Sequence, residues 1–153
     1  MRKKIIKICL FFSALISISS CGFEPLNKSI DLNKITIYEK VFSGNNQLNR
    51  KIFDKLNLKE SDNISDYILK LHSESEIAIL AKNTEGDATS YKTSLLIEVS
   101  LIKDDKIIKN KRFEKSITYP NLNNKFELSK YQKEVENNLV NTTLQQIRVF
   151  LSF

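Results

Sequence analysis

The strongest constraint on this chain is a long two-residue alternation of apolar and polar side chains that starts at Tyr67 and reaches Lys82. The mostly apolar positions are Tyr67, Leu69, Leu71, Ile77, Ile79 and Ala81, and the polar ones are Lys70, His72, Glu74, Glu76 and Lys82. A period of two over this length is typical of a strand, because successive side chains point to opposite faces. The pattern therefore predicts one long strand with a single face on a core.

Two more strands are predicted directly after the first. The second alternating run has Tyr91, Thr93, Leu95, Ile97, Val99 and Leu101 in phase, after a turn-rich segment at residues 82–90. A polar turn at residues 103–106 leads to a third run at residues 107–119, which is more basic and less apolar. Charge discourages pairing with other chains, so this strand suits a sheet edge. At about 3.3 Å per residue the first two strands approach roughly 45 Å, and the tip at residues 82–90 is expected to project beyond any helices.

The segments before and after these strands complete the predicted fold. Ile35, Ile37 and Val41 alternate as in a half-buried strand, and residues 46–57 have helical spacing with Asn45 or Asn46 as the N-cap. Ser129 and Gln132 have capping-box spacing and are expected to begin a final helix that continues to the C-terminus. The apolar positions of this helix drift around its axis, so it has either a broad buried face or a bend near Asn141.

The element order is thus strand, helix, three strands, helix. We expect an α+β two-layer sandwich, in which a four-stranded mixed sheet carries two helices on one face. Residues 34–153 are assigned to this single domain.

The N-terminus has the features of an export signal. Arg2, Lys3, Lys4 and Lys7 precede a short apolar run at residues 8–18, too short to span a bilayer core about 30 Å thick. Residues 18–21, Ile-Ser-Ser-Cys, resemble the lipobox of bacterial lipoproteins. We therefore expect residues 1–20 to be a signal peptide that is removed, Cys21 to be lipidated and residues 21–33 to be a tether. An ordinary signal peptide with a spare Cys21 thiol, or an uncleaved anchor, are the alternatives.

The residues give little support to catalysis or to nucleic-acid binding. Without residues 1–20 the chain has 20 basic and 18 acidic residues and lacks the concentrated basic patch of a nucleic-acid binder. His72 is the single histidine, and no serine-nucleophile motif accompanies it. His72, Glu74 and Glu76 share one strand face, but adjacent members lie about 6.6 Å apart along the strand, which strains metal chelation. We expect a solvated face here, without metal or cofactor, on a protein that binds or assembles rather than catalyses.

Four short motifs resemble the LPS-assembly lipoprotein family LptE, especially its alphaproteobacterial branch. They are CGFEPL at residues 21–26, NRKIFDKLN at 49–57, AKNTEGDATSY at 81–91 and FELSKYQKEVENNL at 126–139. Asn83, Gly86, Thr89 and Tyr91 match the family pattern between its two long strands, and Leu128, Ser129 and Tyr131 match the start of its last helix. Ser90 departs from the Arg that often precedes the tyrosine, which puts in doubt an anion contact there.

The resemblance implies a domain anchored at the inner leaflet of the outer membrane, on the periplasmic side. In that family the domain plugs the LptD β-barrel, helps the barrel to assemble and helps insert lipopolysaccharide, to which it binds, without catalysis. The partners expected here are an LptD-like barrel, lipopolysaccharide and the membrane, but no nucleic acid. The candidate binding residues are Lys82, Asn83, Gly86, Thr89, Tyr91, Lys92, Lys111 and Arg112. An independent membrane-tethered periplasmic lipid carrier or chaperone is the alternative function.

Overall fold

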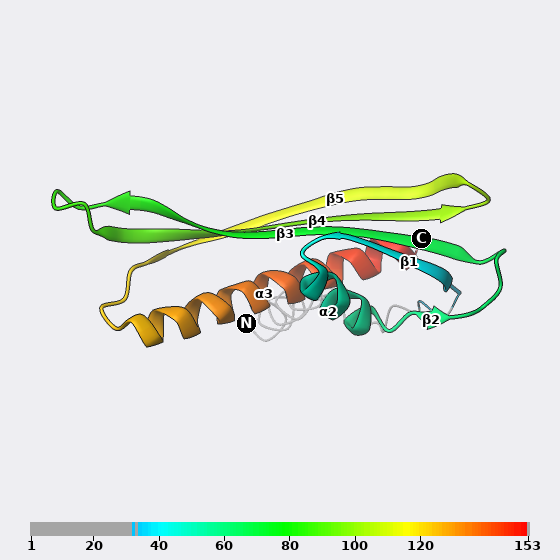
Figure 1. Ribbon diagram of the computed structural model, residues 1–153, viewed down its shortest axis with the longest axis horizontal. Helices are drawn as coiled ribbons and strands as arrows, with labels where there is room; N and C mark the ends of the chain where they lie inside the picture. The colour runs from blue at the N-terminus through cyan, green and yellow to red at the C-terminus, as the bar shows by residue number, and fades with distance from the viewer. Residues whose placement is uncertain (1–31, 33, 153) are drawn as a thin grey trace, which may run out of the picture.

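A five-stranded mixed sheet carries two helices on one face (Figure 1). The computed structural model describes residue 32 and residues 34–152. The strands are β1 (Thr36–Gly44), β2 (Lys59–Glu60), β3 (Tyr67–Lys82), β4 (Ala88–Lys103) and β5 (Lys106–Pro120), and the helices are α2 (Asn46–Leu56) and α3 (Lys125–Ser152). The strand order β2-β1-β3-β4-β5 puts β5 at one edge, as predicted. The expected signal peptide, Cys21 and nearly all of the expected tether lie outside the described residues.

Strands β3, β4 and β5 form an antiparallel meander, as predicted, because short turns connect strands of nearly equal length. The register aligns Leu71 with Val99 and Ile97 with Phe113. In an antiparallel pair, opposite residues share a face. The alternating apolar residues of the three strands are thereby gathered on the side that faces the helices.

A tight joint connects β1 to α2 and docks on β3. Gly44 has φ +73°, and a Cβ at this position would overlap the carbonyl oxygen of Ser73. The backbone N–H of Asn45 donates to that same carbonyl at 2.8 Å, and the Asn45 side chain accepts from the N–H of Leu48 at 3.1 Å as the N-cap of α2. Only glycine combines this backbone conformation with so close an approach. The joint fixes where β1 stops pairing with β3.

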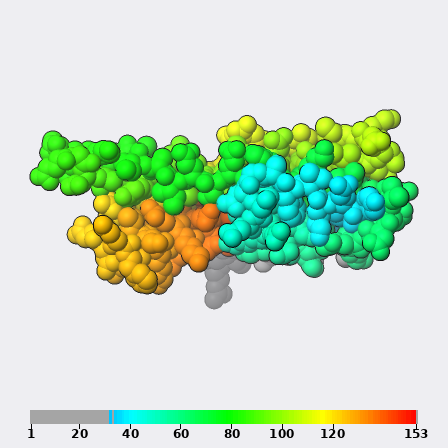
Figure 2. Space-filling model, in the orientation of Figure 1, coloured from blue at the N-terminus to red at the C-terminus, as the bar shows by residue number. Residues whose placement is uncertain are grey.

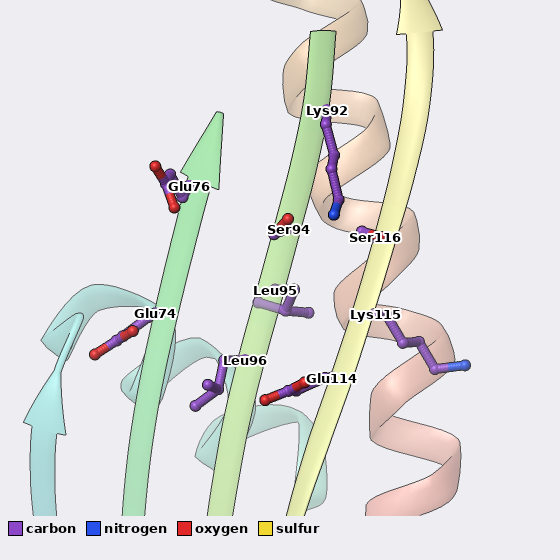
Figure 3. A pocket seen from close by; sticks show the side chains of 9 residues that line it. All are labelled: Glu74, Glu76, Lys92, Ser94, Leu95, Leu96, Glu114, Lys115 and Ser116. Carbon is purple, nitrogen blue, oxygen red and sulfur yellow. The ribbon is translucent and has the colours of Figure 1, made fainter. Parts of the chain in front are cut away.

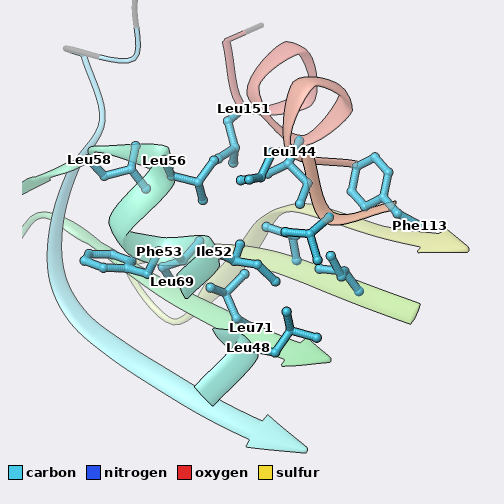
Figure 4. Close-up of a cluster of buried hydrophobic side chains, with 14 of the residues drawn as sticks. Leu48, Ile52, Phe53, Leu56, Leu58, Leu69, Leu71, Phe113, Leu144 and Leu151 are labelled. Atoms are coloured by element: carbon cyan, nitrogen blue, oxygen red, sulfur yellow. The ribbon is translucent and has the colours of Figure 1, made fainter. Parts of the chain in front are cut away.

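The core lies between the sheet and the two helices (Figure 4). Its main contributors are Leu48, Ile52 and Phe53 of α2, Leu69 and Leu71 of β3, Ile97 and Val99 of β4, Phe113 of β5, and Leu144, Ile147 and Leu151 of α3. Burial of each such side chain stabilises the fold by about 1.5–3 kcal/mol. The buried residues of α3 run from Val135 to Leu151, on a helix that continues unbroken through Asn141.

Three local expectations were wrong. The sheet has a fifth strand, β2, in the segment expected only to end the first helix, because Lys59 and Glu60 return beside the start of β1 in parallel register. A register shift at Tyr38 reverses the phase of β1, so Val41 aligns with Lys70 and is exposed, whereas Phe42 aligns with Leu71 and packs on the core. Helix α3 begins at Lys125, earlier than expected, because the Asn124 side chain caps the N–H groups of Phe126 and Glu127.

The far half of β3 was also expected to lie on the core. Its strand phase is as expected, but its burial is not. Ile77 and Ile79 keep the phase of Leu69 and Leu71, yet they are 48% and 51% exposed. Helix α2 lies beneath the near half of β3, and β1 ends at the Gly44 joint, so neither reaches Ile77 or Ile79 (Figure 1). The tip of the hairpin projects beyond the N-terminal end of α3, as expected (Figure 2).

Candidate functional site

The projecting half of the β3–β4 hairpin is the candidate functional site, because most sequence-predicted residues lie on or beside it. The tip loop is built around Asn83, whose side-chain oxygen accepts from the N–H groups of Glu85 at 3.0 Å and Asp87 at 2.8 Å. Gly86 has φ +93° and donates its N–H to the Asn83 carbonyl at 3.1 Å. Asn83 and Gly86 therefore shape the loop that carries the neighbouring side chains.

The tip is tied to the last strand by a second asparagine. Asn121 donates from its backbone N–H to the carbonyl of Thr89 at 2.9 Å and from its side chain to the carbonyl of Ala88 at 2.8 Å. These bonds use the backbone of Thr89 and leave its side chain exposed. Lys82 is exposed at the same end. The tip thus presents a cation and a hydroxyl from a loop with its own hydrogen bonds.

Tyr91 faces the helices and forms part of an aromatic row. It stacks on Tyr119 with ring centroids 6.0 Å apart, and Tyr119 meets the edge of Tyr131 on α3 at 5.4 Å. The Tyr119 hydroxyl also bonds the buried Thr93 hydroxyl at 2.9 Å. Tyr91 is half-buried and links the bare end of β3 to the helix layer.

Lys92 lies on the opposite, outer face of the sheet, which no described helix covers. It lines a shallow hollow of about 350 Å³ together with the carboxylates of Glu74, Glu76 and Glu114 (Figure 3). Lys115 lines the hollow as well, so its lining has three carboxylates and two ammonium groups and is acidic by one charge. The hollow is open to solvent, which screens the interactions between its charged groups.

Lys111 and Arg112 do not join the tip residues. In register they lie opposite Val99 and Glu98, whereas Lys92 lies opposite Thr118, so about 20 Å of strand separates Arg112 from Lys92. Lys111 and Arg112 also point to different faces of the sheet. The Lys111 ammonium lies over the rings of Phe113 at 5.3 Å and Phe150 at 5.9 Å, whereas Arg112 pairs with Glu114 on the outer face. The structure thus divides the predicted basic set into two separate groups.

His72 is engaged at both ring nitrogens. Nδ1 is 3.0 Å from the Ser43 hydroxyl and Nε2 is 3.1 Å from the Glu74 carboxylate. Among the described residues, no cluster of three or more histidine, cysteine or acidic side chains is arranged to hold a metal ion. The three groups instead link β1 to β3 beside the Gly44 joint.

Sequence reasoning missed the uncovered side of β3 beyond Ser73. Ile77 and Ile79 are exposed toward the helices, and Leu80 is 55% exposed as well. A signal was present, because β1 at residues 36–44 is much shorter than β3 and so could not pair with it throughout. Neither described helix is long and apolar enough to cross a membrane.

No family model matches the sequence. No curated protein matches it either.

Solved structures of bacterial lipoproteins share the fold. A minor lipoprotein from Acinetobacter baumannii has a TM-score of 0.58 at 10% identity, over 76% of this chain and 90% of that one. An uncharacterized lipoprotein B from Nitrosomonas europaea has a TM-score of 0.58 at 13% identity, over 74% of this chain and 79% of that one. At such low identity the likeness shows a shared architecture, and most of each neighbour is included in it.

Proposed function

We propose that this chain is an outer-membrane lipoprotein of the LptE type, anchored through Cys21 on the periplasmic side. Its domain fits into the lumen of an LptD-like β-barrel, assists assembly of that barrel and helps to insert lipopolysaccharide into the outer leaflet. The observation that carries the proposal is the long hairpin, which extends past the helix layer (Figure 2).

The fold and the surface both support a plug. The chain shares its architecture with solved proteins described as lipoproteins, and residues 18–21 have the lipobox pattern. The lumen of an outer-membrane barrel is polar, and the open outer face of this sheet carries alternating acids and bases rather than an apolar patch. Several acyl chains on Cys21 would hold the domain at the membrane, since each buried CH₂ contributes about 0.8 kcal/mol.

Contact with lipopolysaccharide is assigned to the projecting end. Lipid A phosphates are strong acceptors for ammonium groups, and Lys82 is the exposed cation beside the tip loop. Lys92 is less suited, because it shares its hollow with three carboxylates. Lys111 is also less suited, because it lies against Phe113 and Phe150 on the helix side.

The proposal includes no catalytic step. His72, the one imidazole of the chain, is positioned between Ser43 and Glu74 on an open strand surface. The backbone N–H of Asn45, in the same joint, is bonded to the Ser73 carbonyl. The alternative of an independent lipid carrier gains nothing from the hollow on the outer face, because its charged lining does not suit acyl chains.

Site-specific photocrosslinking in intact cells tests the proposal. A photoreactive residue at Thr84, in the tip loop, is expected to crosslink to a large outer-membrane β-barrel that mass spectrometry then identifies. The same group at Asp62, in the loop before β3 at the other end of the sheet, serves as the matched exposed control. Crosslinks from Thr84 to soluble periplasmic proteins alone would exclude the plug.

A further inference from the structure

Among residues 32 and 34–152, no strand pairs with one side of β3 beyond the Gly44 joint. Pairing with β1 ends at Gly44 opposite Ser73, whereas pairing with β4 continues to Lys82. We call residues 74–79 of β3 the free edge. Leu80 is a bulge, because the register moves from Ile79–Tyr91 directly to Ala81–Ser90. The free edge is therefore the part of β3 that pairs regularly with β4 on one side and with no described strand on the other. Its length is that of an ordinary strand.

The free edge has charges at Glu74 and Glu76, but none on its second half. Exposed edges usually carry charges or prolines, because unpaired N–H and C=O groups invite pairing with another chain. Strand β5 follows this rule, with six charged residues between Lys106 and Lys115 and Pro120 at its end. In β3 no charged residue lies between Glu76 and Lys82, and Ile77 and Ile79 are about half exposed there. The second half of the free edge is therefore less protected than β5.

The chemistry of the free edge selects an extended backbone as its occupant. An acyl chain or a helix would cover Ile77 and Ile79 but leave the main-chain donors and acceptors of the edge without partners. An added strand satisfies both, with main-chain bonds for affinity and alternate side chains for specificity. Its side chains on the helix side would pack beside Ile77 and Ile79, and those on the other side would lie beside Glu74 and Glu76.

Charge selects between a second copy of this chain and a different protein. Two free edges paired with each other would bring together two carboxylates from each copy, Glu74 and Glu76, with no cation inside the paired stretch. Glu114 adds a third carboxylate to the adjoining hollow, which has two lysines in its lining, Lys92 and Lys115 (Figure 3). Like charges across strands destabilise pairing and opposite charges favour it. The complementary strand carries a lysine or arginine at this point.

We propose that the free edge of β3 accepts an extended segment of a partner protein as an added strand. That segment is apolar toward the helices and has a basic side chain that enters the acidic hollow beside Glu74 and Glu76. The inference goes beyond the proposed function, because it states how a partner binds and does not require the partner to be a barrel.

Amide hydrogen exchange tests the pairing directly. The full-length protein is compared alone in detergent and within the complexes purified with it from membranes. Outward amides in residues 74–79 are expected to exchange fast in the isolated protein and at least about tenfold more slowly in the complex, because strand pairing protects them. Exchange along β5 is expected to stay unchanged. Complexes in which residues 74–79 remain as fast as in the isolated protein would overturn the inference while leaving a barrel partner standing.

Two matched variants locate the effect. Ile77→Lys puts a charge on the free edge, and Ile108→Lys makes the same change at a similarly exposed isoleucine, 52% against 48%, near the opposite end of the sheet. The first is expected to lose at least about tenfold of the captured complex and the second to keep it, with unchanged thermal stability in both. Equal capture by the two variants would contradict the inference. Protection of residues 74–79 in a homodimer would also contradict it, whereas protection by a partner that is not a barrel would support it and refute only the proposed function.

Discussion

The two halves of the β3–β4 hairpin have the same sequence pattern and different surroundings. In the near half, Leu69, Leu71 and Ile97 are buried under α2 and α3. In the far half, Ile77 and Ile79 occupy the same strand phase and are about half exposed. Alternation therefore reports that a face is apolar, and a covering helix or strand decides whether that face becomes core. The near half of β3 is part of the core, whereas the far half of β3 keeps an apolar side that is about half exposed.

The largest predicted effect comes from truncating one isoleucine in each half. Ile97→Ala removes a fully buried side chain and is expected to lower the free energy of unfolding by about 2–5 kcal/mol. Ile79→Ala removes a half-exposed one and is expected to cost less than about 1 kcal/mol. Urea denaturation of the two purified variants measures both values. Similar losses would mean that the far half is covered in the free protein.

The second comparison concerns the two glycines with positive φ. Gly44→Ala would place a Cβ against the Ser73 carbonyl as well as straining the backbone, and a loss of about 2–4 kcal/mol is expected. Gly86→Ala meets open space at the tip, so only the backbone strain of about 1–2 kcal/mol remains. The difference between the two unfolding free energies is the test, since equal losses would show that the Gly44 joint relaxes.

Much of this architecture could be predicted from the sequence, and the failures have a common cause. The long strands, the edge position of β5 and the helices on one face followed from periodicity, which is a local property. Strand β2, the shift at Tyr38 and the bare far half depend on which segments meet in space. Helix α3 was predicted to begin at Ser129, but Asn124 is its N-cap, because the Asn124 side chain accepts from two N–H groups just after β5.

The candidate site divides in the same way. The tip loop could be predicted because Asn83 and Gly86 are turn residues with local roles. The separation of Lys111 and Arg112 from that loop depends on register and on strand direction. The free edge depends on where β1 stops, and the Gly44 joint determines that position. No single sequence motif predicts it.

A third prediction concerns the one buried hydroxyl pair of the far half that the structure describes, Thr93 with Tyr119. Tyr119→Phe leaves the fully buried Thr93 hydroxyl without this partner and is expected to cost about 1–3 kcal/mol. Thr93→Val combined with Tyr119→Phe is expected to recover part of that loss, because neither polar atom then remains buried alone. Thermal denaturation of the single and double variants gives the coupling. Strictly additive losses would show that this bond between β4 and β5 does not couple the two side chains.

The smallest expected effect separates the two helix caps, one in each half of the molecule. Asn45→Ala removes the N-cap of α2 at the Gly44 joint and should cost about 1 kcal/mol of global stability, because α2 is short and packs on the near half. Asn124→Ala removes the cap of α3 at the far end, where Phe126 is 77% exposed and the first buried residue is Val135. Its effect should be confined to faster exchange of the first-turn amides, with a global change below about 0.5 kcal/mol, because a terminal turn can open without unfolding the rest. Urea denaturation together with amide exchange distinguishes the two. A global loss from Asn124→Ala as large as that from Asn45→Ala would mean that the first turns of α3 support the sheet. The difference between the two halves would then apply to the hairpin alone and not to the helix beneath it.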